Sequence, residues 1–181
     1  MSRISGFAPI SNKQAKILVL GSMPSESSIV KQQYYGHPRN AFWPVMLSLF
    51  NLPAGFDKAS YAQRKQLLIN NSIAVWDVLQ SCCRAGSLDA AIKMDSIKIN
   101  DFPSFYLMHT KIATVCFNGA KAEAVYNRYI LPHIKSQFGH LKYIKLPSTS
   151  PAYASMSLKK KTAIWSDSLK PVCAEYNEIN K

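Results

Sequence analysis

The sequence predicts an α/β protein, a three-layer α/β/α sandwich built around a central four-stranded, mainly parallel sheet. Two observations carry this prediction. Short apolar runs rich in β-forming residues recur at residues 17–20, 73–76, 112–117 and 141–146, and stretches with helical spacing separate them. Strands that alternate with helices in this way form parallel sheets covered on both faces.

Helices are expected at residues 41–51, 58–70, 120–131 and 156–169. In the first of them, Phe42, Val45, Met46 and Leu49 recur at intervals of three and four residues, which is the spacing of one helix face. The last helix is expected to kink or end at Pro171, because proline removes an N–H donor and clashes with the preceding turn.

Length and charge narrow the class of protein. With 181 residues, 48% of them hydrophobic, the chain is long enough for one core and short for two, so residues 1–181 are expected to form a single domain and a monomer. The 22 Lys and Arg against 10 Asp and Glu give a formal net charge of +12. This excess is typical of proteins that contact phosphate backbones. The alternative is a merely soluble basic protein, and charge alone does not distinguish DNA, RNA and a membrane surface.

Cysteine and histidine spacing predicts neither a metal site nor a disulfide framework. Cys82, Cys83, Cys116 and Cys173 contain no C-x-x-C pair, and the four histidines are not at zinc-ligand spacing. We expect free thiols in a reducing compartment, no metal and no cofactor. The amino terminus lacks a signal-peptide pattern and no run approaches the length of a membrane span, which favours a cytoplasmic protein, or a nuclear one in a host with a nucleus.

Small, polar, turn-forming residues follow every predicted strand. They are GSMPS at 21–25, Asp77 with the later segment 84–87, Asn118 with Gly119, and PSTSP at 147–151. Open α/β sheets bind ligands outside the carboxyl ends of their strands, so the cleft is expected at this edge. The string QYYGHPRNAFW at 33–43 adds paired tyrosines, a His-Pro turn and an asparagine. An aromatic face beside amide donors suits a flat ring, and we expect a nucleobase site.

With these motifs the chain resembles the uracil-DNA glycosylase superfamily, and within it the hypoxanthine-DNA (deoxyinosine) glycosylase branch. The resemblance rests on five ordered blocks: GSMPS, QYYGHPRNAFW, VWDVLQSCCRAGSLDAAI at 75–92, FNGAKA at 117–122 and LPSTSPA at 146–152. It implies an α/β/α sandwich with a short parallel sheet, no metal, and excision of a damaged base from DNA. Mismatch-specific uracil/thymine glycosylases are similar to a lesser degree.

The chain departs from other branches at two places. Met23 stands where mismatch-type relatives carry an Asn that orders the attacking water, and Ser148, Thr149 and Ser150 stand where others place a His on the departing base. The deoxyinosine branch is similar in relying instead on the Asn of the N-x-F-W string, here Asn40. The resemblance therefore implies a mechanism without a charged water activator at position 23.

Three residues are expected to be catalytic. Asn40 is the first, since a carboxamide can accept from a water and donate to a base edge at once. Its alternative role is a helix N-cap, and the two roles can coexist. Gly21 and Ser22 are expected to present backbone N–H groups to the base or the water, or else to form an ordinary strand-to-loop turn.

Substrate contacts are expected from residues around this centre. Tyr35 is expected to stack on the flipped base, although tyrosines near turns are more often packing residues. Pro24 and Ser25 either reach a phosphate or start a helix. The remaining expected substrate contacts are Met23, His37, Asn118 and Ser148, and the simpler role of Asn118 is to end a strand.

The segment 148–153 is expected to touch the duplex, because its prolines stiffen it, its hydroxyls can hold phosphates and Tyr153 can wedge into the gap left by the flipped nucleotide. The expected DNA contacts are Ser87, Thr149, Ser150, Pro151, Tyr153, Lys159 and Lys160. The alternatives are a rigid loop before the last helix and, for at least one lysine of 159–161, a solvated helix face.

The resulting hypothesis is a monofunctional DNA glycosylase of base excision repair that removes deaminated bases by water attack, hypoxanthine first and uracil second. Its expected partner is double-stranded DNA containing such bases, with single-stranded DNA left open and no membrane. The alternatives are a uracil or G:T/G:U mismatch-specific glycosylase of the same fold, and a catalytically silent nucleic-acid-binding protein. Lyase chemistry is not expected, because the pocket motifs offer no lysine. Asp77 and Glu26 are each either site residues or turn and cap residues.

Overall fold

The computed structural model describes residues 3–50, 52 and 55–179, and it describes their side chains except at 57 and 171–179. Its centre is a four-stranded sheet with strand order β3-β2-β6-β7, in which every neighbouring pair is parallel. The strands are β2 (Ile17–Gly21), β3 (Ile73–Asp77), β6 (Thr114–Asn118) and β7 (Lys142–Leu146). The predicted α/β fold with a four-stranded parallel sheet is confirmed.

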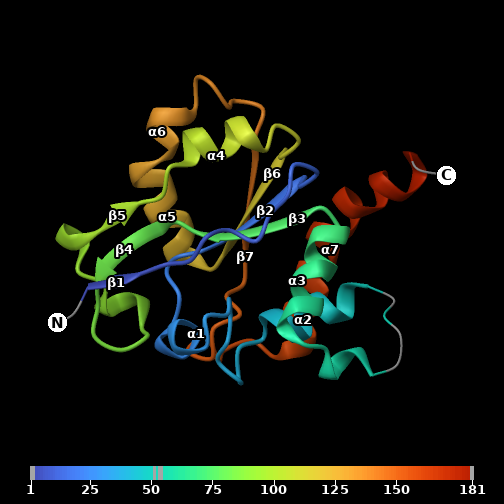
Figure 1. Cartoon of the computed structure of the whole chain (residues 1–181), viewed down its shortest axis with the longest axis horizontal. Helices are drawn as coiled ribbons and strands as arrows, with labels where there is room; N and C mark the ends of the chain where they lie inside the picture. The colour runs from blue at the N-terminus through green and yellow to red at the C-terminus, as the bar shows by residue number, and fades with distance from the viewer. Residues whose placement is uncertain (1–2, 51, 53–54, 180–181) are drawn as a thin grey trace.

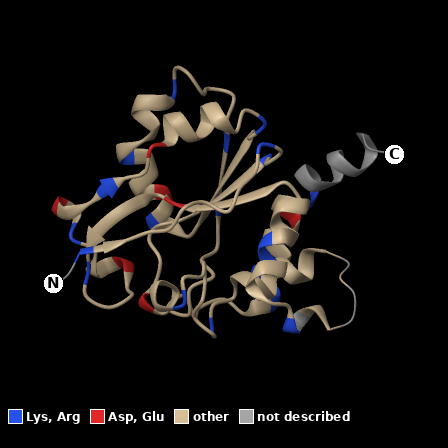
Figure 2. Cartoon of the chain, viewed as in Figure 1, with Lys and Arg blue, Asp and Glu red and all other residues tan. Residues whose placement is uncertain are grey.

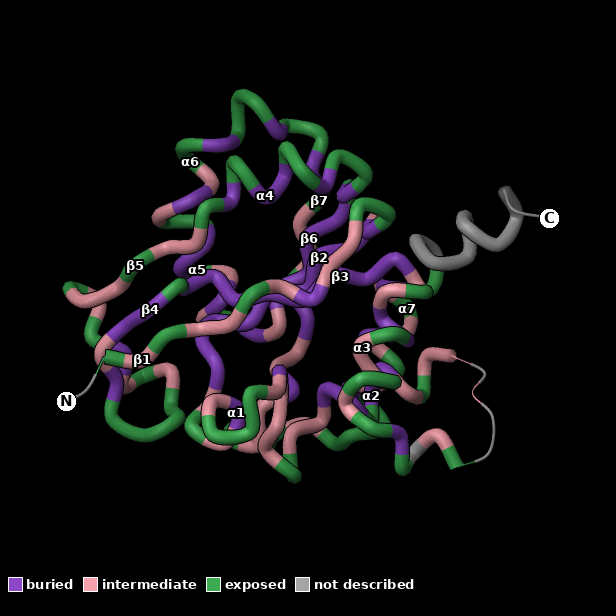
Figure 3. Tube along the Cα trace, viewed as in Figure 1, coloured by how far each residue is buried: buried purple, intermediate pink, exposed green. Residues whose placement is uncertain are grey.

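Helices cover both faces of this sheet (Figure 1). One layer contains α2 (Phe42–Leu49), α3 (Tyr61–Asn70) and α7 (Leu158–Ile179), and the other contains α4 (Phe102–Met108), α5 (Ala120–Tyr129) and α6 (Leu131–Ile134). Strands β2 and β3 are buried at every position, and Figure 3 shows them as the purple interior of the molecule. Strands that are covered on both sides need apolar residues on both sides, which is why these runs do not alternate.

The expected helices are present with shifted bounds. The stretch 58–70 divides into η1 (Phe56–Lys58) and α3, because Ser60 and Gln63 form a capping box that begins a new helix. Residue 51, the end of the first expected helix, lies outside the described residues. Of the two outcomes expected at Pro171, a kink or the end of the helix, the second is wrong: α7 continues to Ile179, since a proline removes one hydrogen bond from the ladder without preventing the turns that follow.

A second, smaller sheet is absent from the sequence-based prediction. It joins β1 (Arg3–Ser5), β4 (Leu79–Cys83) and β5 (Lys98–Ile99) in antiparallel order. Two of these strands have only three and two residues, too few for a period-2 pattern to be recognised. The chain then runs through η2 (Asp89–Ala91) and η3 (Met94–Ser96), and the loop ahead of them lies near α1 (Glu26–Lys31) at the carboxyl edge of the parallel sheet (Figure 1).

Lys and Arg residues are spread over several elements rather than gathered on one (Figure 2). Within the described part of the chain, no group of three or more His, Cys, Asp and Glu is arranged to hold a metal ion. None of the described helices combines the length and the apolar character that crossing a membrane requires.

Candidate active site

A cavity of about 280 Å³ lies at the carboxyl ends of the parallel strands, the edge where the sequence places the cleft. This volume is near the lower end of the roughly 300–1,000 Å³ of ligand pockets, which suits a small ring. Every predicted turn segment contributes to its wall. The expected site residues that line it are Gly21, Ser22, Met23, Pro24, Ser25, Tyr35, Asn40, Ser87, Asn118, Ser148, Thr149, Ser150 and Tyr153.

Gly21 ends β2 at a point where two polar side chains approach its backbone. A Cβ at this position would lie 2.5 Å from Oδ1 of Asp77 and 3.3 Å from the hydroxyl oxygen of Tyr35. The first distance is too short for any side chain. The close approach of these two side chains favours glycine here, and the carboxyl and phenol groups both lie beside the end of the strand.

Tyr35 lines the cavity with one face of its ring covered. The ring stacks on that of Phe42 with a centroid distance of 3.9 Å and an interplanar angle of 22°. Its backbone has φ 55°, a left-handed conformation that costs energy for a residue other than glycine. The hydroxyl is buried and has no hydrogen-bond partner among the described residues. Burial, with a smaller contribution from Asp77 and against the opposing effect of the nearby Asn118 amide, raises the pKa of Tyr35, so the phenol stays neutral and can donate.

Asn40 lies at the start of α2 and also lines the cavity. Its Oδ1 accepts a hydrogen bond from the backbone N–H of Phe42 at 2.9 Å, although the N-cap position itself is occupied by Ala41 and not, as the alternative expected, by Asn40. The N–H of Ala41 donates to the carbonyl of Thr149 at 2.9 Å and ties the helix start to the segment 148–150. The amide oxygen has a second lone pair, and the Nδ2 group has two N–H donors of its own. The Asn40 carboxamide can therefore form further hydrogen bonds.

The first motif is held by the loop that follows β4. The Ser22 hydroxyl donates to Oδ1 of Asp89 at 2.5 Å, and the backbone N–H of Glu26 donates to the Ser87 hydroxyl at 3.0 Å. Ser25 is the N-cap of α1, so of its two expected roles it has the one of starting a helix. These contacts bring Asp89 to the cavity, a residue that the sequence alone did not single out.

Arg84 fixes the same loop from inside the protein. It is only 4% exposed and donates to the carbonyls of Pro24 at 2.5 Å and Gly86 at 2.8 Å. Its guanidinium therefore donates to backbone oxygens, and a salt bridge between Lys145 and Glu123 lies elsewhere in the molecule.

Asp77 ends β3 and is 3% exposed on the cavity wall. Its Oδ2 has no hydrogen-bond partner among the described residues. Burial, reinforced by the nearby Asp89 carboxylate and opposed by Arg84, raises the pKa of Asp77 to about 8. At pH 7 this raised pKa favours the neutral carboxylic acid over the charged form that a general base requires.

Asn118 and Thr149 form a reciprocal pair across the cavity wall. The Asn118 Nδ2 donates to the Thr149 hydroxyl at 2.8 Å, and the Thr149 backbone N–H donates to Asn118 Oδ1 at 2.8 Å. Thr149 is 1% exposed, so the structure does not place its hydroxyl where a duplex would meet it. The sequence could not show this, because the pairing joins residues of two different strands' ends.

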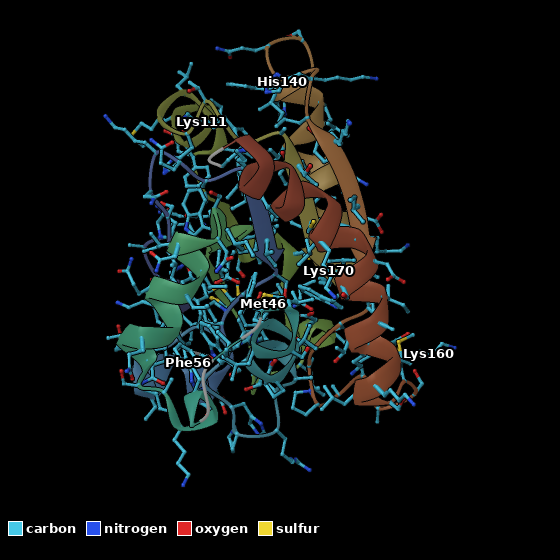
Figure 4. All side chains as sticks on the ribbon, turned by 90° about the vertical axis from the view of Figure 1, so that its right-hand side faces the viewer. Met46, Phe56, Lys111, His140, Lys160 and Lys170 are labelled. Atoms are coloured by element: carbon cyan, nitrogen blue, oxygen red, sulfur yellow. The ribbon has the colours of Figure 1, made fainter. Side chains whose placement is uncertain are left out.

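A buried lysine, Lys161, contacts the rim of the cavity near the last helix. Tyr153 is 38% exposed; its carbonyl accepts from Lys161 Nζ at 2.7 Å, and this ammonium lies 5.1 Å from its ring centroid. Lys161 is 5% exposed and burial lowers its pKa, so it is not on a solvated face. Lys159 and Lys160 are exposed. In Figure 4, Lys160 lies near the start of α7, far from Lys111 and His140, which lie at the opposite end of the molecule.

Four expected site residues do not line the cavity: His37, Pro151, Lys159 and Lys160. The His37 Nδ1 accepts from the backbone N–H of Arg39 at 3.1 Å, and this ring lines a separate groove beside Trp43. Conversely, Lys121 of the FNGAKA block does line the cavity, and its Nζ lies 3.5 Å from the sulfur of Met94. The expectation of no lysine in the pocket motifs is therefore corrected: the first turn of α5 follows the strand end directly and carries this lysine to the edge.

These features define a class of protein, an α/β/α sandwich with a small polar cavity, suited to a ring, at the carboxyl edge of its parallel sheet. Residues 8–169 match the family model of the uracil DNA glycosylase superfamily, and the chain belongs to this superfamily.

Similar proteins agree with this assignment. Two of them, from Methanosarcina acetivorans and Methanosarcina barkeri, are described as hypoxanthine DNA glycosylases. Each is 38% identical to this chain over 117 residues, which cover 65% of this chain and 72% of the relative. The chain is also similar to a solution NMR structure of a Methanosarcina acetivorans protein described as a uracil DNA glycosylase, with a TM-score of 0.73 and 32% identity over 92% of this chain and 98% of that one.

Proposed function

We propose that this member of the superfamily is a monofunctional DNA glycosylase that hydrolyses the N-glycosidic bond of deaminated bases in DNA, hypoxanthine first and uracil second. The observation that carries the proposal is the convergence of the Asn40 carboxamide, the Tyr35 ring and the end of β2 on one small cavity. The names of the relatives support hypoxanthine as the first substrate and uracil as the second.

The cavity suits the charges that develop during this reaction. Breaking the bond places positive charge on the sugar and negative charge on the departing base, so well-aimed hydrogen-bond donors lower the barrier by roughly 3 kcal/mol each. Asn40 can donate to the base through Nδ2 while its oxygen, already fixed by Phe42, accepts from the attacking water. The flipped base stacks on one face of the Tyr35 ring, and Phe42 stacks on the other face.

Water attack proceeds without a charged activator at the first motif. Met23 lines the cavity, is 7% exposed and has no hydrogen-bonding group able to deprotonate water. A sugar with oxocarbenium character accepts a weak nucleophile, so orienting the water is enough. The base must first leave the stack at a cost of a few kcal/mol, which is smaller for a mispaired base and thus contributes to selection of deaminated sites.

The proposed partner is duplex DNA, with the rim of the cavity meeting the strand that carries the lesion. Tyr153 is half-exposed at this rim, and Lys159 and Lys160 are exposed at the start of α7, where their charges can meet phosphates. Contacts of this kind hold the duplex without reading its sequence, which suits an enzyme that must find a base in any context.

The test is base release from end-labelled duplexes containing hypoxanthine opposite thymine, compared with uracil in G:U and A:U pairs and in single strands. We expect hypoxanthine release to be fastest and Asn40→Ala to lower the single-turnover rate by about 100-fold or more, the usual effect of losing one such donor. Asn12→Ala, in a turn whose side chain bonds only its own loop, is the matched control.

Each alternative has its own outcome in this test. Release of uracil alone would replace our proposal with the uracil or mismatch enzyme. Binding without release of any base, with a strong salt dependence, would support the catalytically silent binder. Unchanged binding and turnover in Asn40→Ala would remove this side chain from the mechanism.

A further inference from the structure

A second cavity lies at the amino ends of the parallel strands, the end of the molecule opposite to the candidate active site. Its volume is about 230 Å³, and its wall is formed by the end of α4, the turn before β6 and the segment before β7. Figure 4 shows Lys111 and His140 at this end and Lys160 at the other. A cavity of about 150 Å³ can hold a benzene ring, so this one has room for one aromatic side chain. The proposed mechanism assigns no role to it.

The second cavity is preformed and mostly apolar. Its wall includes Tyr106, Leu107, His109, Ile112, Phe138 and His140. The His109 ring stacks on that of Phe105 at a centroid distance of 4.1 Å, and its Nδ1 donates to the carbonyl of Phe105 at 2.8 Å. The backbone N–H of Ile112 donates to the His109 carbonyl at 3.0 Å. These contacts fix the wall, so a ligand does not have to order it on binding.

Two consecutive large apolar side chains at the end of α4 are exposed to solvent. Leu107, on the wall of the second cavity, is 59% exposed, and Met108 is 60% exposed. Single exposed apolar side chains are common on proteins, whereas an apolar patch that continues into an apolar cavity marks an interaction site. This end of α4 therefore offers an incoming apolar side chain both a cavity and a cover.

Every charged side chain of the segments around this cavity is basic. Three segments meet here and contain five lysines, three histidines and no Asp or Glu: residues 11–16, 102–113 and 131–142. Backbone hydrogen bonds join them, since the N–H of Ala113 donates to the Lys16 carbonyl at 3.0 Å and the N–H of Lys142 donates to the Ala113 carbonyl at 2.9 Å. Asp101 caps the far end of α4, roughly 10 Å away along a helix of this length. The surface around the cavity therefore attracts negative charge.

The apolar cavity and the positive charge together select the class of partner. A second copy of this chain docked on the same face would place lysines against lysines. DNA is held through its phosphates by cationic and polar groups, which gives the exposed Leu107 and Met108 nothing to contact. An acidic peptide with one bulky apolar side chain matches both features, because its carboxylates meet the lysines and its apolar side chain fills the cavity.

We propose that the amino edge of the sheet docks an acidic segment of another protein. One aromatic or large aliphatic side chain of this partner enters the second cavity, and its Asp and Glu side chains lie against Lys111, Lys135 and Lys142, which are exposed. The docking surface faces away from the candidate active site, so a partner can hold the protein while the carboxyl edge of the sheet engages DNA. The inference goes beyond the proposed function and does not depend on which base is released.

The test is fluorescence anisotropy with the fluorescein-labelled acidic peptide EDDEFEDDE, titrated with the full chain at low salt. We expect saturable binding that weakens about 30-fold when serine replaces the central phenylalanine of the peptide, which is the loss of one anchoring side chain. Leu107→Gln should weaken binding about 10-fold. Lys111→Glu should weaken it about 5-fold, and this second effect should shrink at high salt, where exposed charges are screened.

Matched controls come from exposed side chains on other elements. Val30→Gln on α1 and Lys58→Glu on η1 make the same kinds of change at exposed positions, and both should bind the peptide as the wild type does. Circular dichroism shows that each variant is folded. Amide chemical shifts should change on addition of the peptide at Thr110 and Gln137, which line the second cavity, and not at Asn40.

Four outcomes would overturn the proposal. The first is no binding of the peptide, and the second is equal binding of the phenylalanine and serine peptides, which would show attraction by charge alone. The third is displacement of the peptide by an undamaged DNA duplex together with weaker duplex binding in Leu107→Gln, which would make this surface a second DNA site. The fourth is a wild-type dimer in sedimentation that Leu107→Gln dissociates, which would make the occupant a second copy. None of these readouts requires base release, so failure of the proposed function leaves them intact.

Discussion

The protonation state of Asp77 has a consequence for folding that can be measured without substrate. In the unfolded chain an aspartate has its ordinary pKa near 3.8, whereas in the folded protein burial raises the pKa of Asp77 to about 8. Between these values the folded state holds one proton more than the unfolded state. Unfolding then releases a proton, so this group makes the protein less stable as pH rises from 4 to 8 and contributes no further change above that.

The size of the effect follows from the shift. Each pH unit inside the window costs about 1.4 kcal/mol, so the free energy of unfolding falls by about 4 kcal/mol from pH 4 to pH 7 through Asp77 alone. This is a large share of the stability of roughly 5–15 kcal/mol that single domains have. Asp77→Asn removes the titration, so the stability of this variant relative to the wild type must increase over the same range.

Urea unfolding of the two proteins at pH 5, 6, 7 and 8, followed by tryptophan fluorescence, measures this difference. The slope against pH is the readout, because any constant cost of burying the asparagine amide cancels from it. Asp167→Asn, which removes an exposed carboxylate on α7, controls for the loss of one negative charge. A stability difference that stays constant from pH 5 to pH 8 would show that Asp77 is already ionised in the folded protein, and the argument from burial would be refuted.

Three further changes test the geometry of the cavity. Gly21→Ala places a Cβ 2.5 Å from the carboxyl oxygen beside it, so base release should fall about 10-fold or more while the circular dichroism spectrum is kept; unchanged release would show that this edge is not in contact with the base. Asn118→Ala leaves the buried N–H of Thr149 without its acceptor, which should cost roughly 1–3 kcal/mol in chemical unfolding and speed hydrogen exchange at that amide; retained protection would contradict the pairing. Lys160→Met should reduce the salt dependence of duplex binding by about one counterion. Lys161→Met removes a buried hydrogen bond to the Tyr153 carbonyl, so it should lower thermal stability and leave the salt dependence nearly unchanged. The reverse pattern would show that Lys161, and not Lys160, contacts the DNA.

The architecture was predictable where one local signal was strong. Strands β2 and β3 are apolar runs of the length that a doubly covered strand needs, and the structure places them with β6 and β7 in one parallel sheet. The antiparallel sheet of β1, β4 and β5 was not predictable, because strands of two or three residues acquire their pairing only from neighbours distant in sequence. The continuation of α7 through Pro171 was also not predicted, for a different reason: a long helix tolerates the loss of one ladder hydrogen bond.

The sequence by itself determined the edge of the sheet that carries the cavity, because turn residues after parallel strands must gather at the strands' carboxyl ends. It also determined that Asn40 and Tyr35 belong to one motif beside that edge. Only the tertiary structure decided what each polar group does there. It turned Thr149 inward onto Asn118, left His37 outside, and buried Asp77 beside Gly21 with an oxygen unpartnered. Burial and distance set protonation and hydrogen bonding, and both are properties of the packed chain that residue order does not display.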